Sequence, residues 1–150
     1  MIDKVKIGDK GVFIGFHDKG DCGVTCTLAC AEEPKPAFKK ALAALAAHVV
    51  HICELPDDWE QDLTVRGVAF TWKHEIMGAR IMASRDLETR DGPFVFATPH
   101  APEEAYTETE DGGEALLLTP ECANALHTVL KQAEAYIAGQ RAQGKLPFTE

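Results

Sequence analysis

The residues that most suggest a metal site are three cysteines with C-x3-C-x3-C spacing: Cys22, Cys26 and Cys30. With Val24 and Leu28 they occupy one face of an expected strand. Successive cysteines on such a strand lie about 13 Å apart at roughly 3.3 Å per residue, and a zinc ion with bonds of about 2.3 Å cannot join them. We therefore expect the three thiols to be buried, reduced and metal-free.

A second candidate metal site is the pair His48 and His51, three residues apart on an expected helix. Two histidines at this spacing can share a metal ion, and Glu54, Asp57 or Asp58 would supply a further ligand. No second ligand motif accompanies them, so we favour two histidines on the polar face of the helix. We expect no metal and no cofactor.

The candidate ligand-contacting residues belong to the expected sheet region and its ends: Trp72, Arg80, Thr98 and His100. His100 precedes an acidic segment, at a position where loops commonly carry binding residues. Trp72 is followed by four cations that would make a basic patch beside a ring able to stack on a base: Lys73, Arg80, Arg85 and Arg90. We favour ordinary solvated sheet positions for these cations.

Catalytic motifs are missing from the sequence. No serine or cysteine nucleophile comes with a fixed partner, and there is no G-x-S-x-G, no Walker loop and no H-E-x-x-H. We therefore expect a binding protein rather than an enzyme, with no catalytic residues to assign.

The C-terminal segment fits Q-x-x-L-x-F, a loose form of the peptide by which bacterial proteins bind the replicative sliding clamp. Gln143 would donate and accept hydrogen bonds at the edge of a preformed pocket, and Leu146 and Phe148 would fill it. The alternative is that Leu146 and Phe148 pack on the chain's own core or on a second subunit of a homo-oligomer. The sequence leaves both open.

Charge is unevenly distributed along the 150 residues. The net charge is −9, yet the stretch 101–122 holds seven acidic residues and no basic one, so the rest is nearly balanced. This disfavours general nucleic-acid binding, although a local basic face remains compatible with it. No apolar run approaches the roughly 20 residues of a membrane span, and no signal-peptide layout opens the chain. Five cysteines at irregular spacing favour a reducing compartment, and we expect the cytoplasm.

The candidate residues are positioned by strands and helices that the sequence pattern predicts. Alternating patterns predict strands over 5–7, 12–16 and 22–30, and then over 63–72, 79–83 and 94–98. The phase of the alternation flips at Gly67, which predicts a β-bulge. A polar acidic loop is expected over 99–113, more mobile over 101–114 than the strands around it.

Two amphipathic helices complete the pattern. One begins near Pro36, ends at Pro56 and carries an apolar stripe: Phe38, Leu42, Leu45, Val49 and Ile52. The other begins after Thr119, the expected N-cap. We predict an α+β domain over 1–139, of order roughly βββ-α-βββ-α, with two helices on one face of an antiparallel sheet. Residues 140–150 form a tail.

Several short segments resemble a family of small proteins encoded by tailed bacteriophages and prophages. The likeness rests on 51–56, 65–68, 77–81, 96–100 and the closing helix up to Gln143. The family is commonly found in early gene clusters for replication and recombination. The resemblance implies a phage protein acting in the host cytoplasm, and no catalytic residues carry over. Its members end in a tighter peptide, Q-x-x-L-F, whereas here Pro147 separates the two anchors.

Three functions follow as hypotheses. The first is an accessory protein of phage DNA replication or recombination that binds a host protein, the sliding clamp, through its tail. The second is an anti-defence protein that sequesters a small nucleotide ligand, with residues 98–100 and the following loop as a lid. The third is an acidic mimic of nucleic acid that uses the run from Glu103 to Glu114.

Overall fold

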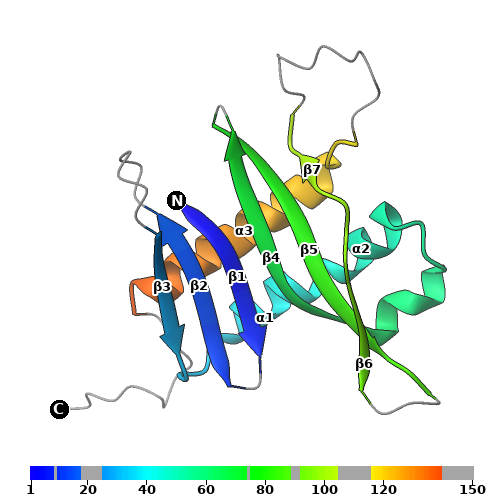
Figure 1. Ribbon diagram of the computed structural model, residues 1–150, viewed down its shortest axis with the longest axis horizontal. Helices are drawn as coiled ribbons and strands as arrows, with labels where there is room; N and C mark the ends of the chain where they lie inside the picture. The colour runs from blue at the N-terminus through cyan, green and yellow to red at the C-terminus, as the bar shows by residue number, and fades with distance from the viewer. Residues whose placement is uncertain (9, 18–24, 74, 89–91, 105–115, 140–150) are drawn as a thin grey trace.

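The computed structural model describes residues 1–8, 10–17, 25–73, 75–88, 92–104 and 116–139. In this part of the chain six antiparallel strands form one sheet in the order β3-β2-β1-β4-β5-β6, and a short seventh strand pairs with β5 (Figure 1). The strands are β1 (Ile2–Gly8), β2 (Gly11–His17), β3 (Thr25–Cys30), β4 (Leu63–Lys73), β5 (Ile76–Asp86), β6 (Pro93–Ala97) and β7 (Ala101–Pro102).

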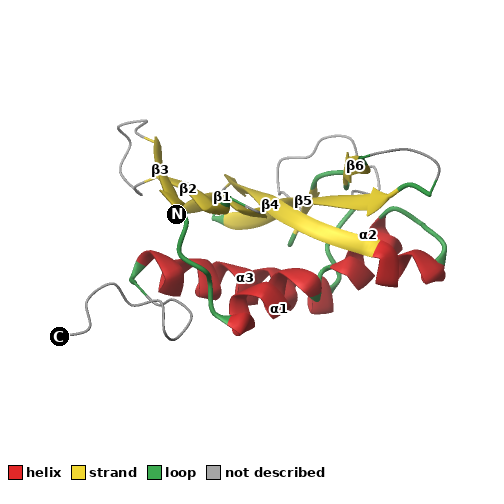
Figure 2. Ribbon diagram, turned by 90° about the horizontal axis from the view of Figure 1, so that it is seen from below, coloured by secondary structure: helices red, strands yellow, loops and turns green. Residues whose placement is uncertain are grey.

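The helices lie together on one face of this sheet (Figure 2). They are α1 (Pro36–Ala43), α2 (Ala46–Ile52), the 3₁₀ helix η1 (Asp57–Asp62) and α3 (Pro120–Ile137). The predicted α+β class, with two main helices packed on an antiparallel sheet, is confirmed. Each half of the chain contributes three strands and then helix, and the first strands of the two halves, β1 and β4, pair at the centre of the sheet.

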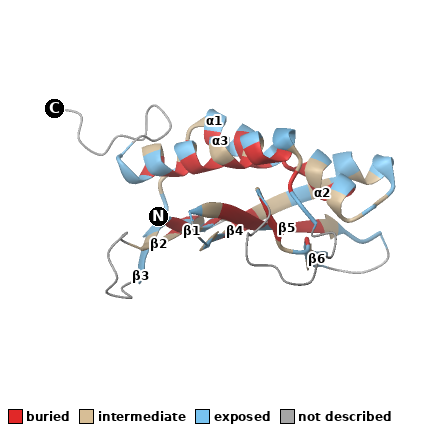
Figure 3. Ribbon diagram, turned by 90° about the horizontal axis from the view of Figure 1, so that it is seen from above, coloured by how far each residue is buried: buried red, intermediate tan, exposed pale blue. Residues whose placement is uncertain are grey.

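The core lies between the sheet and the helices, where Figure 3 shows the buried residues facing one another. Val5, Val68 and Ile81 stand in register across β1, β4 and β5, and each is at most 1% exposed. Leu45 and Leu126 are wholly buried on the helical side. Burying each such side chain contributes about 1.5–3 kcal/mol, which is why the strands alternate between apolar and polar residues.

The predicted first helix is present as two segments. The stripe Phe38, Leu42, Leu45 and Val49 is buried as expected, but α1 ends at Ala43 and α2 begins at Ala46. At the junction the N–H of Leu45 donates to the carbonyl of Leu42, so the helix tightens locally to a 3₁₀ bond. The periodic stripe survives this change, which is why the sequence pattern did not reveal it.

Two local predictions are confirmed. The pairing of β4 with β5 shifts register between Val65 and Gly67, where the change of phase indicated a β-bulge. Thr119 caps α3, because its side-chain oxygen accepts a hydrogen bond from the N–H of Cys122 at 3.1 Å, and Pro120 opens the helix.

The predicted loop over 99–113 is wrong at its beginning. Ala101 and Pro102 form β7 against Gly78 and Ala79 of β5, and Ala101 is 1% exposed. The segment pairs because β5 is longer than β6 and leaves this part of its edge open. Residues 105–115 and the tail 140–150 lie outside the described residues. None of the helices in the described ranges is long and apolar enough to cross a membrane.

Candidate functional site

The helices leave the opposite face of the sheet uncovered (Figure 2). Strand alternation decides which side chains it presents. In β1, Val5 points into the core, so Lys4 and Lys6 point to the open face, and both are exposed. In β2 the same alternation leaves Phe13 on the open face, 36% exposed and paired with Lys6.

Cations from three neighbouring strands gather on this open face. Lys4 pairs with Ala69 of β4, and Ala69 pairs with Arg80 of β5, so Lys4 and Arg80 stand in one row with a small residue between them. Arg66, beside the bulge in β4, donates from Nε to Ser84 Oγ of β5 at 2.8 Å. A charge of −9 for the whole chain therefore conceals a locally basic surface.

Two glycines occupy positions in the open face where a larger residue would clash. Gly67 lies so close to β1 that an added Cβ would be 2.3 Å from the carbonyl oxygen of Val5. At Gly78 an added Cβ would be 2.5 Å from His100 Nε2 and 2.6 Å from Thr71 Oγ1. Only glycine leaves room for these contacts.

His100 is held at one end of the open face by a short network. Its Nε2 lies 2.7 Å from Thr71 Oγ1, above Gly78. Thr98 positions the segment, because its N–H donates to the carbonyl of Ile81 and its hydroxyl accepts from the N–H of Ile81, both at 2.9 Å. Thr98 is 2% exposed. Of the four predicted ligand-contacting residues, Arg80 and His100 thus share the open face, while Thr98 is buried beside them.

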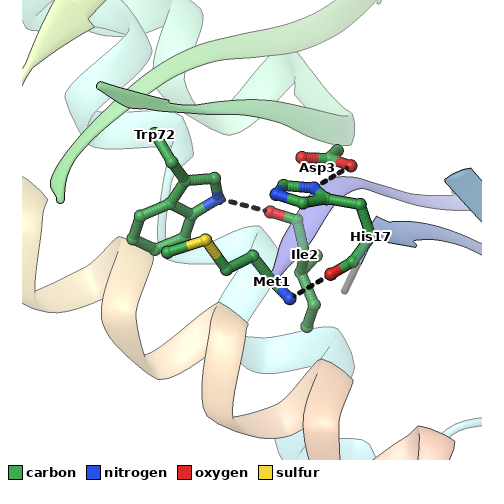
Figure 4. A network of polar contacts seen from close by, with 5 residues as sticks. All are labelled: Met1, Ile2, Asp3, His17 and Trp72. Carbon is green, nitrogen blue, oxygen red and sulfur yellow. Dashed lines mark hydrogen bonds and ion pairs between the residues drawn. The ribbon is translucent and has the colours of Figure 1, made fainter. Parts of the chain in front are cut away.

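Trp72 lies on the other face. It has the parity of Phe70 and Val68, packs against the core, and donates from Nε1 to the carbonyl of Ile2 at 2.8 Å (Figure 4). The same corner contains a 2.7 Å contact between His17 Nδ1 and Asp3 Oδ2. Trp72 therefore fastens the start of β1 to β4.

Arg80 and Arg85 do not support the less favoured hypothesis of a basic patch beside Trp72. Arg80 pairs with Ala69 and faces away from Trp72, across the sheet. Arg85 lies on the helix-facing side, where its guanidinium stands 4.2 Å from the centroid of the Trp59 ring. Arg90 lies outside the described residues. The patch fails because residues of opposite parity point to opposite faces.

His48 and His51 line a cleft of about 930 Å³ between α2, η1 and the start of α3, together with Glu54, Asp57 and Cys122. Partial burial lowers the pKa of His48, partly opposed by the charge of Glu121. Within the described ranges no group of three or more His, Cys, Asp or Glu side chains is arranged to hold a metal ion. Neither this cleft nor a second one of about 1090 Å³ at the end of the sheet is lined by Thr98 or His100.

The expected burial of the three strand cysteines is wrong for Cys26, which is exposed, and only partial for Cys30. They share the core-facing parity with Leu28, but β3 is the edge strand, and the helical layer covers its inner face incompletely. Cys22 lies outside the described residues. Among the described cysteines Cys122, on α3, is the buried one, and burial raises the pKa of its thiol to about 11.

This contrast predicts selective alkylation. With iodoacetamide at pH 8, Cys26 should be modified in the native protein and Cys122 should remain unmodified until the chain is unfolded. A pKa near 11 lowers the thiolate population at pH 8 by at least about two orders of magnitude relative to an ordinary thiol, and burial blocks access. Peptide mapping by mass spectrometry measures both sites, with denatured protein as the control. Equal labelling of the two in the native state would contradict the assignment.

Sequence reasoning missed Lys4, Lys6 and Arg66 as members of a common surface. The signal was the alternation of Lys4, Val5 and Lys6, which marks two outward cations on one strand. That these meet Arg80 depends on the pairing of β1 with β4, between residues more than sixty positions apart. The predicted clamp-binding residues lie in the undescribed segment 140–150: Gln143, Leu146 and Phe148.

Comparisons with protein-family models, with curated proteins and with solved structures each found no match to this chain.

Proposed function

We propose that the chain is a non-enzymatic accessory protein of phage DNA replication or recombination. It acts in the host cytoplasm and binds a host protein, the replicative sliding clamp, through Gln143, Leu146 and Phe148. The observation that carries the proposal is the Q-x-x-L-x-F pattern placed directly after the last helix of the domain.

The end of α3 supports this placement. Ala138 caps the helix, with its N–H donating to the carbonyl of Glu134 at 3.0 Å. Gly139 follows at a φ of 106°, and its N–H donates to the carbonyl of Tyr136 at 3.0 Å. A glycine at positive φ is a common way for a helix to end. The helix thus closes before Gln143, and the pattern does not belong to it.

The composition of the core also supports the proposal. The largest fully buried side chains among the described residues lie between Val5 and Tyr136, from both the strands and the helices. These elements form a continuous core by themselves. A peptide beyond residue 139 is therefore not required to complete that core.

The chemistry of the three residues suits a short docking peptide. Burying a leucine and a phenylalanine contributes about 3–6 kcal/mol before the costs of association. A micromolar dissociation constant corresponds to about 8 kcal/mol of net binding free energy, so the peptide reaches it only with good hydrogen bonds from Gln143. Pro147 holds its φ near −65° and limits the conformations that the unbound peptide samples.

The anti-defence alternatives have less support. A protein that sequesters a nucleotide needs a concave site with convergent polar groups. The hydroxyl of Thr98 is already engaged with the backbone of β5, and the cleft of about 1090 Å³ places Glu32, Glu33 and Glu60 around its two cations. The acidic mimic would depend on the run from Glu103 to Glu114, in which Glu103 lies 2.9 Å from His127 Nε2 and residues 105–114 lie outside the described part of the chain.

Isothermal titration calorimetry against the sliding clamp of the bacterial host tests the proposal. The wild type should bind with a micromolar dissociation constant, and a Leu146→Ala/Phe148→Ala variant should bind at least about 100-fold more weakly, because it loses both apolar anchors. Its thermal unfolding should match that of the wild type.

The matched control removes two exposed apolar side chains from the domain instead, as Leu116→Ala/Leu117→Ala; the two leucines are 44% and 43% exposed. This variant should bind the clamp as the wild type does. No binding by the wild type, or equal weakening by both variants, rules out the proposed contact. If the tail variant unfolds or changes oligomeric state, the tail packs on the protein itself and the proposal is wrong.

A further inference from the structure

The open face of the sheet combines three features that the proposed function does not use. The first is its charge. Lys4, Lys6 and Arg80 are exposed there, and Arg66 stands beside them at the bulge. The acidic residues within the described strands are Asp3, held by His17, and Asp86, at the end of β5, and Glu103 follows β7 beside β5.

The second feature is the spacing of these cations. Lys4 and Lys6 are two residues apart on β1, about 7 Å, and Lys4 and Arg80 are separated by two inter-strand steps, about 10 Å. Stacked nucleotides advance by about 3.4 Å along a strand. The cations therefore stand about two to three nucleotide steps apart, so that one single strand can contact several of them with its phosphates.

The third feature is an aromatic ring at the level of the cations. Phe13 projects from β2 on the same face, paired with Lys6 and 36% exposed. An exposed ring on a sheet is a platform on which an unpaired base stacks. A single-stranded nucleic acid uses both features, with phosphates on the cations and a base on the ring.

The shape of the face selects an extended ligand. Gly15, Gly67 and Ala69 place nothing larger than a methyl group at the register positions next to Lys4, Lys6 and Arg80. Small ligands prefer concave sites, whereas a polymer can lie across a flat one. Of the two clefts described above, the one beside α2 contains none of the residues named for the open face, and the one at the end of the sheet shares only Arg66 with them.

From these features we infer that the open face binds single-stranded nucleic acid, with Lys4, Lys6, Arg66 and Arg80 contacting phosphates and Phe13 stacking on a base. The inference does not depend on residues 143–148. It is compatible with the acidity of the whole chain, because the phosphates meet the local surface and salt screens charges that lie more than about 10 Å away.

This inference can be tested by fluorescence anisotropy with a labelled oligothymidylate of about 20 nucleotides. The affinity is measured at salt concentrations from about 50 to about 200 mM. The wild type should bind at low salt with an affinity that falls steeply as salt rises. The Lys4→Gln/Arg80→Gln variant should bind at least about ten-fold more weakly, and its salt slope should fall by about 1.4, because each lost phosphate contact removes about 0.7. Phe13→Ala should weaken binding at least about five-fold without changing the slope.

The matched control is Lys40→Gln/Lys131→Gln, which removes the same charge from two exposed positions on α1 and α3. It should leave both affinity and slope unchanged, and so should Leu146→Ala/Phe148→Ala. A wild type that does not bind the oligonucleotide at low salt overturns the inference. The inference is also overturned if Lys4→Gln/Arg80→Gln and the control Lys40→Gln/Lys131→Gln lose affinity equally. It is overturned as well if duplex DNA binds as tightly as the single strand and Phe13→Ala has no effect.

Discussion

The Tyr136→Ala variant is expected to lose about 3–5 kcal/mol of the free energy of unfolding. Tyr136 is 1% exposed, and its ring meets Phe38 of α1 edge-on, with centroids 5.9 Å apart and an interplanar angle of 66°. This contact joins α3 to α1, so the truncation opens a cavity between the two helices that lie over the sheet. An aromatic pair of this kind adds about 0.5–1.5 kcal/mol beyond the burial of its area.

A second variant, Tyr136→Phe, separates the contribution of the hydroxyl's hydrogen bond to stability from that of ring packing. The hydroxyl donates to the carbonyl of Glu32 at 2.5 Å and so ties the last helix to the segment after β3. Tyr136→Phe keeps the ring and should cost only about 1 kcal/mol. Urea denaturation followed by circular dichroism measures both variants through the shift in midpoint at constant slope. If the phenylalanine variant loses as much as the alanine variant, the hydrogen bond is the main contribution and packing against Phe38 is not.

The second large effect is expected for Gly67→Ala, which should lower the free energy of unfolding by about 3 kcal/mol. The added methyl group would meet the carbonyl oxygen of Val5 at 2.3 Å and the Cα of Lys6 at 3.1 Å. Both are backbone atoms of β1, so no side chain can rotate away. The central pairing of β1 with β4 must open, and this pairing joins the two halves of the sheet.

Gly8→Ala is the matched control for this variant. Gly8 also belongs to β1, but an added Cβ there meets nothing within 4 Å. Its free energy of unfolding should stay within about 0.5 kcal/mol of the wild type. Chemical denaturation of the two variants measures the difference in the free energy of unfolding. If Gly67→Ala is as stable as Gly8→Ala, then β1 and β4 accommodate the methyl group without loss of stability. Because Lys4 and Lys6 flank the contact, Gly67→Ala should also disturb the open face.

Much of the local structure was determined by the sequence. Thr119 and Pro120 specify the start of α3, since a hydroxyl accepts from a free N–H and proline suits the first turn. The change of phase at Gly67 specifies the bulge, because side chains alternate with a period of two. These signals act over a few residues and can be interpreted without knowing the neighbours. The order of three strands, helix, three strands and helix follows from them.

What the sequence leaves open is which strands become neighbours. Alternation assigns Cys26 to the core-facing side of β3, but it does not say that β3 lies at the edge, where that side is incompletely covered. It likewise does not place Trp72 and Arg80 on opposite faces until the register of β4 with β5 is known.

The open face was decided by the tertiary structure alone. Lys4 and Arg80 come from distant parts of the chain and share a row only because β4 lies between their strands, with Ala69 paired to both. Local propensity specifies whether a residue is extended and which of two sides it takes, because those depend on its own backbone and its nearest neighbours. Strand order depends on the burial of the whole apolar face against the helices, a sum over contacts distant in sequence, and no short pattern contains that sum.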